Sequence, residues 1–184
     1  FADFRANALQ QAAELALPKP DRTNISKWNF IDVAAHTVES AAYASLNELP
    51  ETVKAIIDAD AQQNLYIQRN NTPAFIRVSN ELTSKGVIIT DIETAIREHA
   101  DLVEQYFMTT AVKVDEHQLT AYHAALVNGG VFVYVPRNVI VEEPIQVVFV
   151  HDNAEASLFN HVLIVAEQSS AVTYVETYIS TVEE

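Results

Sequence analysis

Two histidines and two carboxylates around one loop form the best candidate for a metal centre in this sequence. His151 and His161 flank a loop that contains Asp152 and Glu155. Imidazole and carboxylate groups are common metal ligands, but a zinc site needs three or four ligands that converge on one point. The spacing in this loop matches no established ligand pattern, so the sequence predicts no metal-binding residue.

The histidines on predicted helices favour packing over chemistry. His99 and His123 occupy apolar positions of two helical patterns, where a hydrogen-bonded, partly buried imidazole is the ordinary expectation. His117 and His123 are six residues apart, so they do not share one helical face as a metal-binding pair four residues apart would. None of these histidines is therefore assigned to a catalytic or metal site.

No pattern in the chain supports catalysis. Glu142 and Glu143 are adjacent in a β-rich stretch, where neighbouring side chains point to opposite faces and cannot flank one bond as an acid and base pair. The only adjacent glycines, Gly129 and Gly130, belong to no phosphate-binding motif, and no G-x-S-x-G sequence marks a nucleophile. We expect no enzyme, with no catalytic and no cofactor-binding residue.

Composition narrows the class of partner. The chain has no cysteine, which excludes a thiolate nucleophile, a disulfide framework and a cysteine-ligated cluster within it. The lack of cysteine is compatible with a cytoplasmic location, which is the location that we expect. A formal charge of −14 disfavours nucleic acid and anionic membranes as partners. No apolar run approaches the roughly 18 residues that would span a bilayer.

The first two thirds of the chain predict mainly helices. Apolar residues recur at helical spacing over Ala2–Leu17, and a Pro-Lys-Pro sequence ends that pattern. Later, Thr90 with Glu93 and Asp115 with Gln118 have the spacing of capping boxes, and an apolar helical stripe follows each pair. The sequence therefore predicts two further helices that begin at these caps.

Shorter elements are expected between these helices. Trp28, in the segment Asn24–Val33, is expected to anchor a loop on the core, because large aromatic residues dominate burial. A short helical or irregular segment is expected from Pro50 toward residue 61. Leu65–Arg69 and Ala74–Val78 are β-prone runs joined by an Asn-rich link, which predicts a hairpin.

Beyond residue 130 the pattern is β throughout. Asn128-Gly129-Gly130 is expected to end the preceding helix, because glycine tolerates the left-handed cap conformation. Runs rich in Val, Ile, Tyr and Phe then alternate with turn formers. These runs are Val131–Val135, Val139–Val141, Ile145–Val150, His161–Ala166 and Val172–Ile179. Several are apolar on both faces, which a two-layer sandwich and a β-helix both explain.

Four segments resemble the SufB/SufD family of iron–sulfur cluster assembly proteins. They are Leu17–Val33 (LPKPDRTNISKWNFIDV), Thr83–Ala95, Ala121–Phe149 (AYHAALVNGGVFVYVPRNVIVEEPIQVVF) and Leu158–Thr181 (LFNHVLIVAEQSSAVTYVETYIST). They occur in order and at matching spacing through nearly the whole chain. The lack of cysteine favours the SufD branch over the SufB branch. Family members are about twice this length, so the chain resembles an N-terminal fragment.

The resemblance implies an α+β fold, with a helical or mixed domain over residues 1–128. The first coils of a right-handed parallel β-helix would follow over residues 129–184. It also implies a non-catalytic scaffold that acts with a SufB-like subunit and a SufC-like ATPase, while the whole complex assembles the iron–sulfur cluster transiently. The contact with the ATPase would lie beyond residue 184. A homodimer is left open.

A carbohydrate-binding or carbohydrate-active β-helix protein is the alternative. Tyr174, Glu176 and Tyr178 alternate and would share one face of a strand, as in a sugar-binding groove. No second acid is placed to work with Glu176, and cross-strand aromatic residues commonly stabilise sheets. The scaffold function is therefore preferred.

Overall fold

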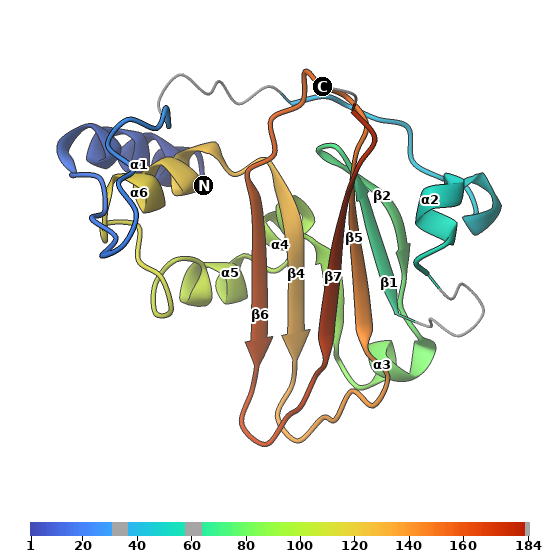
Figure 1. Cartoon of the computed structure of the whole chain (residues 1–184). Helices are drawn as coiled ribbons and strands as arrows, with labels where there is room; N and C mark the ends of the chain where they lie inside the picture. The colour runs from blue at the N-terminus through green and yellow to red at the C-terminus, as the bar shows by residue number, and fades with distance from the viewer. Residues whose placement is uncertain (31–36, 58–63, 183–184) are drawn as a thin grey trace.

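Two open β-sheets and the helices that cover them make up the computed structural model, which describes residues 1–30, 37–57 and 64–182 (Figure 1). The helical elements are α1 (Ala2–Glu14), the 3-10 turn η1 (Leu46–Glu48), α2 (Glu51–Lys54), α3 (Asn80–Ser84), α4 (Ile92–Glu98), α5 (Ala100–Tyr106) and α6 (Gln118–Leu126). The strands are β1 (Leu65–Arg69), β2 (Thr72–Arg77), β3 (Ile88–Asp91), β4 (Gly129–Val135), β5 (Ile145–His151), β6 (Asn160–Ala166) and β7 (Tyr174–Ser180).

The last four strands alternate between the two sheets. One sheet has the order β2-β1-β5-β7 and the other has the order β3-β4-β6. β6 pairs in parallel with β4, and β7 pairs in parallel with β5. β6 and β7 thus each pair with the strand two places earlier in the chain, and the strand between the two partners belongs to the opposite sheet. An isolated parallel bridge between Ile140 and Ala171 links the two connections at the same end.

The space between the sheets is filled by one face of each central strand. Val133 of β4 and Val147 of β5 are completely buried there, and Tyr66 of β1 joins them. Strand neighbours point to opposite faces, so the intervening residues of β4 and β5 face outward. Val133 and Val147 therefore face inward, between the two sheets.

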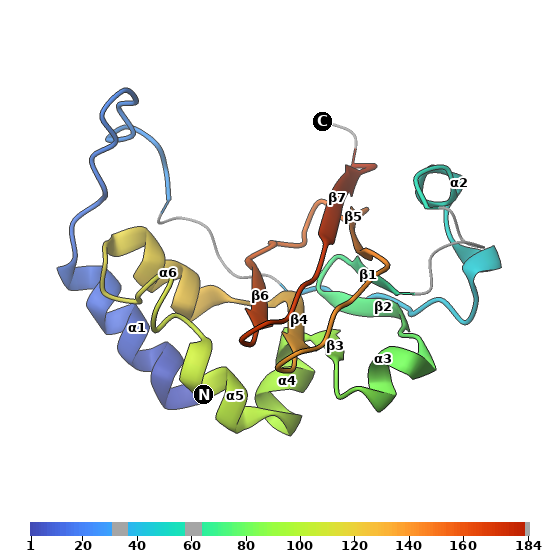
Figure 2. The ribbon, with the colours of Figure 1, turned by 90° about the horizontal axis from the view of Figure 1, so that it is seen from below.

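Helices cover the outer face of the sheet that contains β4. Phe132 of β4 is fully buried among residues of α4, α5 and α6, and Val165 of β6 joins the same cluster. Figure 2 shows α1, α4, α5 and α6 on this side. Helices α1 and α6 pack through alanines, with Ala12 and Ala124 completely buried, because small side chains let the helices approach closely.

The outer face of the other sheet is covered by a shorter segment. Val53 of α2 and Leu49 pack on Ile67 of β1 and Val148 of β5. β4 and β5 are therefore each buried on both faces, which explains their unbroken apolar sequences. The molecule is layered as helices, sheet, sheet and a short helical segment (Figure 2).

Gly130 lies inside a strand and does not cap a helix. α6 ends at Leu126 with Val127 as its cap, so the predicted glycine stop is wrong. Gly130 has φ of 125°, and a Cβ atom there would overlap the backbone of His161 in the neighbouring strand. The glycine is thus needed for the close approach of β4 to β6.

Both helix starts lie close to the predicted positions but use different caps. The side chain of Asp91 accepts a hydrogen bond from the Thr94 amide at the start of α4. His117, not Asp115, caps α6 and forms a capping box with Thr120. A cap is set by which side chain reaches a free amide, and several candidates stood within three residues of each start.

Three other expectations have different outcomes. The hairpin is confirmed, with β1 and β2 antiparallel. Trp28 is 57% exposed, so the predicted anchor on the core is wrong. The first apolar stripe is interrupted at His99, where α4 ends and α5 begins. Residues 31–33 of the Trp28 segment and residues 58–61 of the segment from Pro50 lie outside the described part.

The mixed α+β class is confirmed, whereas a parallel β-helix is not. The described strands form two open sheets, with no closed or solenoid sheet among them. β1 pairs with β5 and β3 pairs with β4, so both sheets combine strands from before and after residue 128. The division into domains 1–128 and 129–184 stays a prediction.

A charge between the sheets should prevent folding. Val133→Asp or Val147→Asp places an unpaired carboxylate in the inner core, at a cost of several kcal/mol against a total stability of about 5–15 kcal/mol. Tyr134→Ser, on the half-buried outer face of β4, should cost about 1–3 kcal/mol. The yield of soluble protein, followed by thermal melts of every variant that is soluble, ranks the three variants, and a Tyr134 variant that is the least stable would contradict the assignment of the faces.

Candidate functional site

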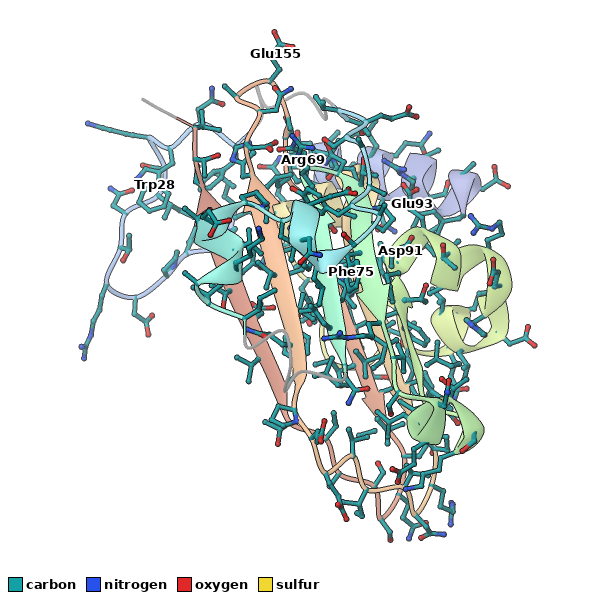
Figure 3. The ribbon with its side chains drawn as sticks, turned by 90° about the vertical axis from the view of Figure 1, so that its right-hand side faces the viewer. Trp28, Arg69, Phe75, Asp91, Glu93 and Glu155 are labelled. Carbon is teal, nitrogen blue, oxygen red and sulfur yellow. The ribbon has the colours of Figure 1, made fainter. Side chains whose placement is uncertain are left out.

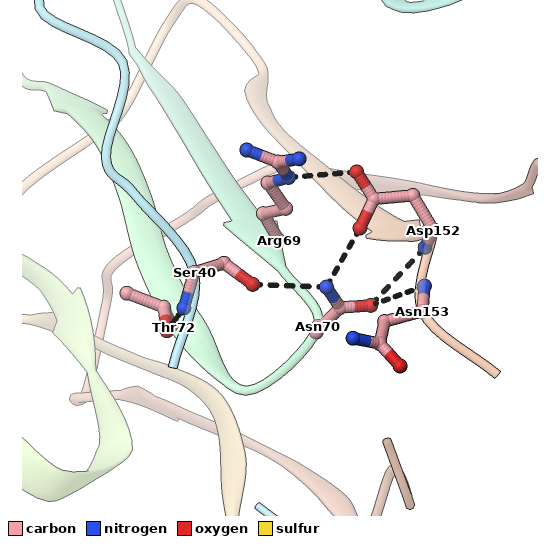
Figure 4. A network of polar contacts seen from close by, with 6 residues as sticks. All are labelled: Ser40, Arg69, Asn70, Thr72, Asp152 and Asn153. Carbon is pink, nitrogen blue, oxygen red and sulfur yellow. Dashed lines mark hydrogen bonds and ion pairs between the residues drawn. The ribbon is translucent and has the colours of Figure 1, made fainter. Parts of the chain in front are cut away.

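A network of polar side chains joins the β1–β2 turn to the loop after β5 (Figure 4). Asn70 sits at the turn with φ of 50°, a left-handed conformation that asparagine tolerates. Its side-chain amide donates to Asp152 Oδ1 at 2.7 Å and to Ser40 Oγ at 2.9 Å. Asn70 Oδ1 accepts from the backbone amides of Asp152 and Asn153. Every polar atom of this side chain is used within the fold.

Arg69 adds the one ion pair in this network. Its Nε donates to Asp152 Oδ2 at 2.7 Å, and its guanidinium lies 5.7 Å from the centre of the Tyr43 ring. Both partners of the ion pair are mostly buried. Asp152, which the sequence placed in a candidate metal loop, is therefore engaged with Arg69 and Asn70, and its two carboxylate oxygens hold the strand ends together.

A second buried network crosses between the sheets. Gln68 is 1% exposed and accepts a hydrogen bond from the Gly130 amide at 2.8 Å through Oε1. Its Nε2 donates to Asn160 Oδ1 and to the Asn70 carbonyl. The Tyr66 hydroxyl lies within hydrogen-bond distance of Gln68 Oε1 and the Gly130 carbonyl, and burial raises the pKa of Tyr66 far above its usual range. These contacts fix the register of β1, β4 and β6 at one end.

His123 and His161 meet where the helices dock on the sheet. His123 Nε2 lies 2.9 Å from His161 Nδ1, so one nitrogen donates and the other accepts. The Phe107 ring packs on His161 with ring centroids 4.3 Å apart. Burial lowers the pKa of His161 to about 4, with a smaller contribution from His123, and burial also lowers the pKa of His123. Burial therefore favours the uncharged form of both rings, in which one facing nitrogen donates and the other accepts.

The predicted loop group does not converge. His161 pairs with His123 in the helix layer, Asp152 pairs with Arg69, and Glu155 is exposed. Across residues 1–30, 37–57 and 64–182, no group of three or more histidines and carboxylates could hold a metal ion. The residues of the loop group therefore do not converge on one metal-binding point.

The tyrosine–glutamate row on β7 faces the space between the sheets. Tyr174, Glu176 and Tyr178 pair with the inward positions of β5, and the Tyr174 hydroxyl donates to Glu176 Oε2 at 2.7 Å. Tyr178 stacks on Phe149 with ring centroids 4.9 Å apart. Burial and the adjacent Glu176 carboxylate raise the pKa of Tyr174 beyond its usual range. This row extends the inner core toward the open side.

The most prominent surface is the pair of open strand edges. β6 ends one sheet and β7 ends the other, so within the described chain each strand is paired along one side only. Ile164 of β6 is 37% exposed, and Val175 and Tyr178 of β7 are 44% and 58% exposed. Unpaired backbone groups beside exposed apolar side chains are a template for further strand pairing. The geometry is that of an interaction surface.

Sequence comparison identifies the family of this chain. A family model described as the SufBD protein N-terminal region matches residues 4–147. The chain belongs to the SufB/SufD family. The iron-sulfur cluster assembly protein SufD of Bacillus subtilis is 59% identical over 181 residues, which cover 98% of this chain and 41% of that protein. An iron-sulfur cluster assembly SufBD family protein of Staphylococcus haemolyticus is 30% identical over 95% of this chain.

The chain therefore spans about two fifths of the length of these SufB/SufD relatives. The described helices include none that is long and apolar enough to cross a bilayer. Sequence reasoning missed Gln68 and Asn70, the central residues of the two networks. Their only signal is a polar residue inside or just after an apolar strand, which also describes many solvated positions.

The histidine pair should make stability depend on pH. The unfolded chain binds protons at these histidines more strongly than the folded chain, so stability is full above about pH 6.5 and falls as the pH drops toward 4. Urea unfolding should show a loss of roughly 1–2 kcal/mol from pH 7.5 to 5.5. His161→Gln should flatten this slope, and an unchanged slope would contradict the assignment.

Proposed function

We propose that the protein is a non-catalytic scaffold subunit of the machinery that assembles iron–sulfur clusters, and that this chain is its N-terminal part. It would act with a SufB-like subunit and a SufC-like ATPase. The observation that carries the proposal is the identity of 59% to a SufD protein along 98% of the chain. The cytoplasmic location expected from the sequence is part of the same proposal.

The proposal includes a parallel β-helix that continues beyond this chain. The alternation of β4, β5, β6 and β7 between two sheets, with parallel pairing at each return, supports it. So does the open edge, because further strands can pair with the free sides of β6 and β7. In such a fold the Tyr174–Glu176–Tyr178 row would be covered by the next coil.

A scaffold function also fits how this chain uses its polar residues. The half-buried carboxylate Asp152 and the buried amides Gln68 and Asn70 bind other parts of the fold. We propose that the cluster is a product which the whole complex holds transiently, and that no cofactor resides in residues 1–184.

Co-purification tests the partners. The full-length protein, co-expressed with the SufB-like and SufC-like proteins of the same organism, should retain both through affinity and size-exclusion chromatography. Residues 1–184 alone should lose the ATPase, because that contact is assigned to the portion beyond residue 184. A circular dichroism spectrum that shows folded protein is the control for this fragment. Equal retention of the ATPase by both chains would contradict the assignment.

Anaerobic reconstitution tests the absence of a resident cluster. Residues 1–184, incubated with ferrous iron, sulfide and a reductant and then desalted, should contain far less than one iron per chain. The reason is that the sequence supplies no thiolate, and the described histidines and carboxylates form no group of three. Stoichiometric iron with the visible absorption of a cluster would overturn this part of the proposal.

The carbohydrate alternative has no support. Glu176 is exposed, accepts a hydrogen bond from the Tyr174 hydroxyl and is paired with Val147 of the neighbouring strand. Neither the family match nor the relatives described above are carbohydrate-active proteins. Tyr174 and Tyr178 are accounted for by packing against the inner face of β5.

A further inference from the structure

One loop projects from the helix layer and contributes little to the core. After α1 the chain leaves the body of the molecule and curves back through residues 15–30 (Figures 2 and 3). Its residues are exposed or half-buried, and none is fully buried. The loop surrounds a concave space of about 590 Å³ that is lined by residues 16–26. Packing against the core therefore does not explain which residues this loop contains.

The loop is basic in an acidic protein. Lys19, Arg22 and Lys27 are exposed, and Asp21 is the only acidic residue among residues 15–30. The whole chain, by contrast, has 11 basic and 25 acidic residues. Within the described residues, ion pairs are formed by Lys54, Arg69, Lys85 and Arg97, and none is found for Lys19, Arg22 or Lys27. The three charges of the loop are thus available to a partner.

The same loop presents the only tryptophan. Trp28 is 57% exposed and has the half-buried Phe30 beside it, with ring centroids 5.9 Å apart. Local bonds hold the turn before it: the Ser26 amide and hydroxyl both donate to Asn24 Oδ1, and the Trp28 amide donates to the Ile25 carbonyl. Figure 3 shows Trp28 on this loop, away from the sheets. A preorganised Trp beside Arg and Lys has the composition of a binding hot spot.

We propose that residues 15–30 are a docking surface for an acidic face of a protein partner, with Trp28 inserted into an apolar recess of that partner. The positive loop would be attracted to such a face, and acidic side chains could enter the concave space beside Arg22. A polyanion is disfavoured, because a molecule with a net charge of −14 repels nucleic acid and anionic lipid over a wide area. The inference rests on the proposed function, which supplies the partners to test.

Binding of the full-length protein to the immobilised SufB-like and SufC-like subunits, measured by biolayer interferometry, tests this surface. Lys19→Glu/Lys27→Glu should weaken binding to one subunit by about tenfold or more, and this difference should shrink at high salt. The matched control Lys113→Glu/Arg137→Glu reverses two exposed charges elsewhere and should change binding less than about twofold. Trp28→Ala should also weaken binding by about tenfold, and Trp28→Phe should restore part of it.

The outcomes separate the two proposals. If the unmodified protein binds the subunits and the loop variants bind equally well, the docking surface is wrong and the scaffold function stands. If the unmodified protein binds neither subunit, both are overturned. If the loop variants instead lose binding to a DNA oligonucleotide or to phosphatidylserine vesicles, with subunit binding unchanged, the partner is a polyanion and the acidic protein face is refuted.

Discussion

The burial of β4 and β5 on both of their faces is the constraint on which the rest of this structure depends. Their inner faces fill the space between the sheets, where Val133 and Val147 are completely buried. Their outer faces need separate cover, which the helices supply over Phe132 and the segment around α2 supplies over Val148. The layered arrangement follows, because an apolar face left uncovered would lose about 25 cal/mol for each Å².

The buried polar residues form hydrogen bonds with backbone groups that the layers enclose. A strand end enclosed between layers leaves backbone groups without water, and each such group costs free energy unless it is paired. Gln68 bonds the Gly130 amide, and Asn70 bonds the amides of Asp152 and Asn153. The side chains that first suggested chemistry, Asp152 and His161, are thus structural ties between distant parts of the chain.

Features set by local periodicity could be read from the sequence, and features set by long-range contacts could not. The alternation along β4 and β5 predicts which residues share a face, because neighbouring strand residues must point to opposite sides. The contact of His123 with His161, by contrast, depends on how a helix docks on a strand 38 positions away. Trp28 was misplaced for a related reason: its type predicts burial, whereas its loop never returns to the core. Gly130 was interpreted as a helix stop from its neighbours in the sequence. The glycine is needed because the backbone of β6 lies against it, and β6 is far along the chain.

An experimental structure of the full-length protein, in which the pairing of the strands after β7 is read, tests the central claim most directly. The claim is that β4 to β7 begin a parallel β-helix whose open edges take further coils. The account predicts that the next strand pairs in parallel with β6, that the following strand pairs in parallel with β7, and that Glu176 is covered between the sheets. Antiparallel strands, or helices, along the free edges of β6 and β7 would contradict it.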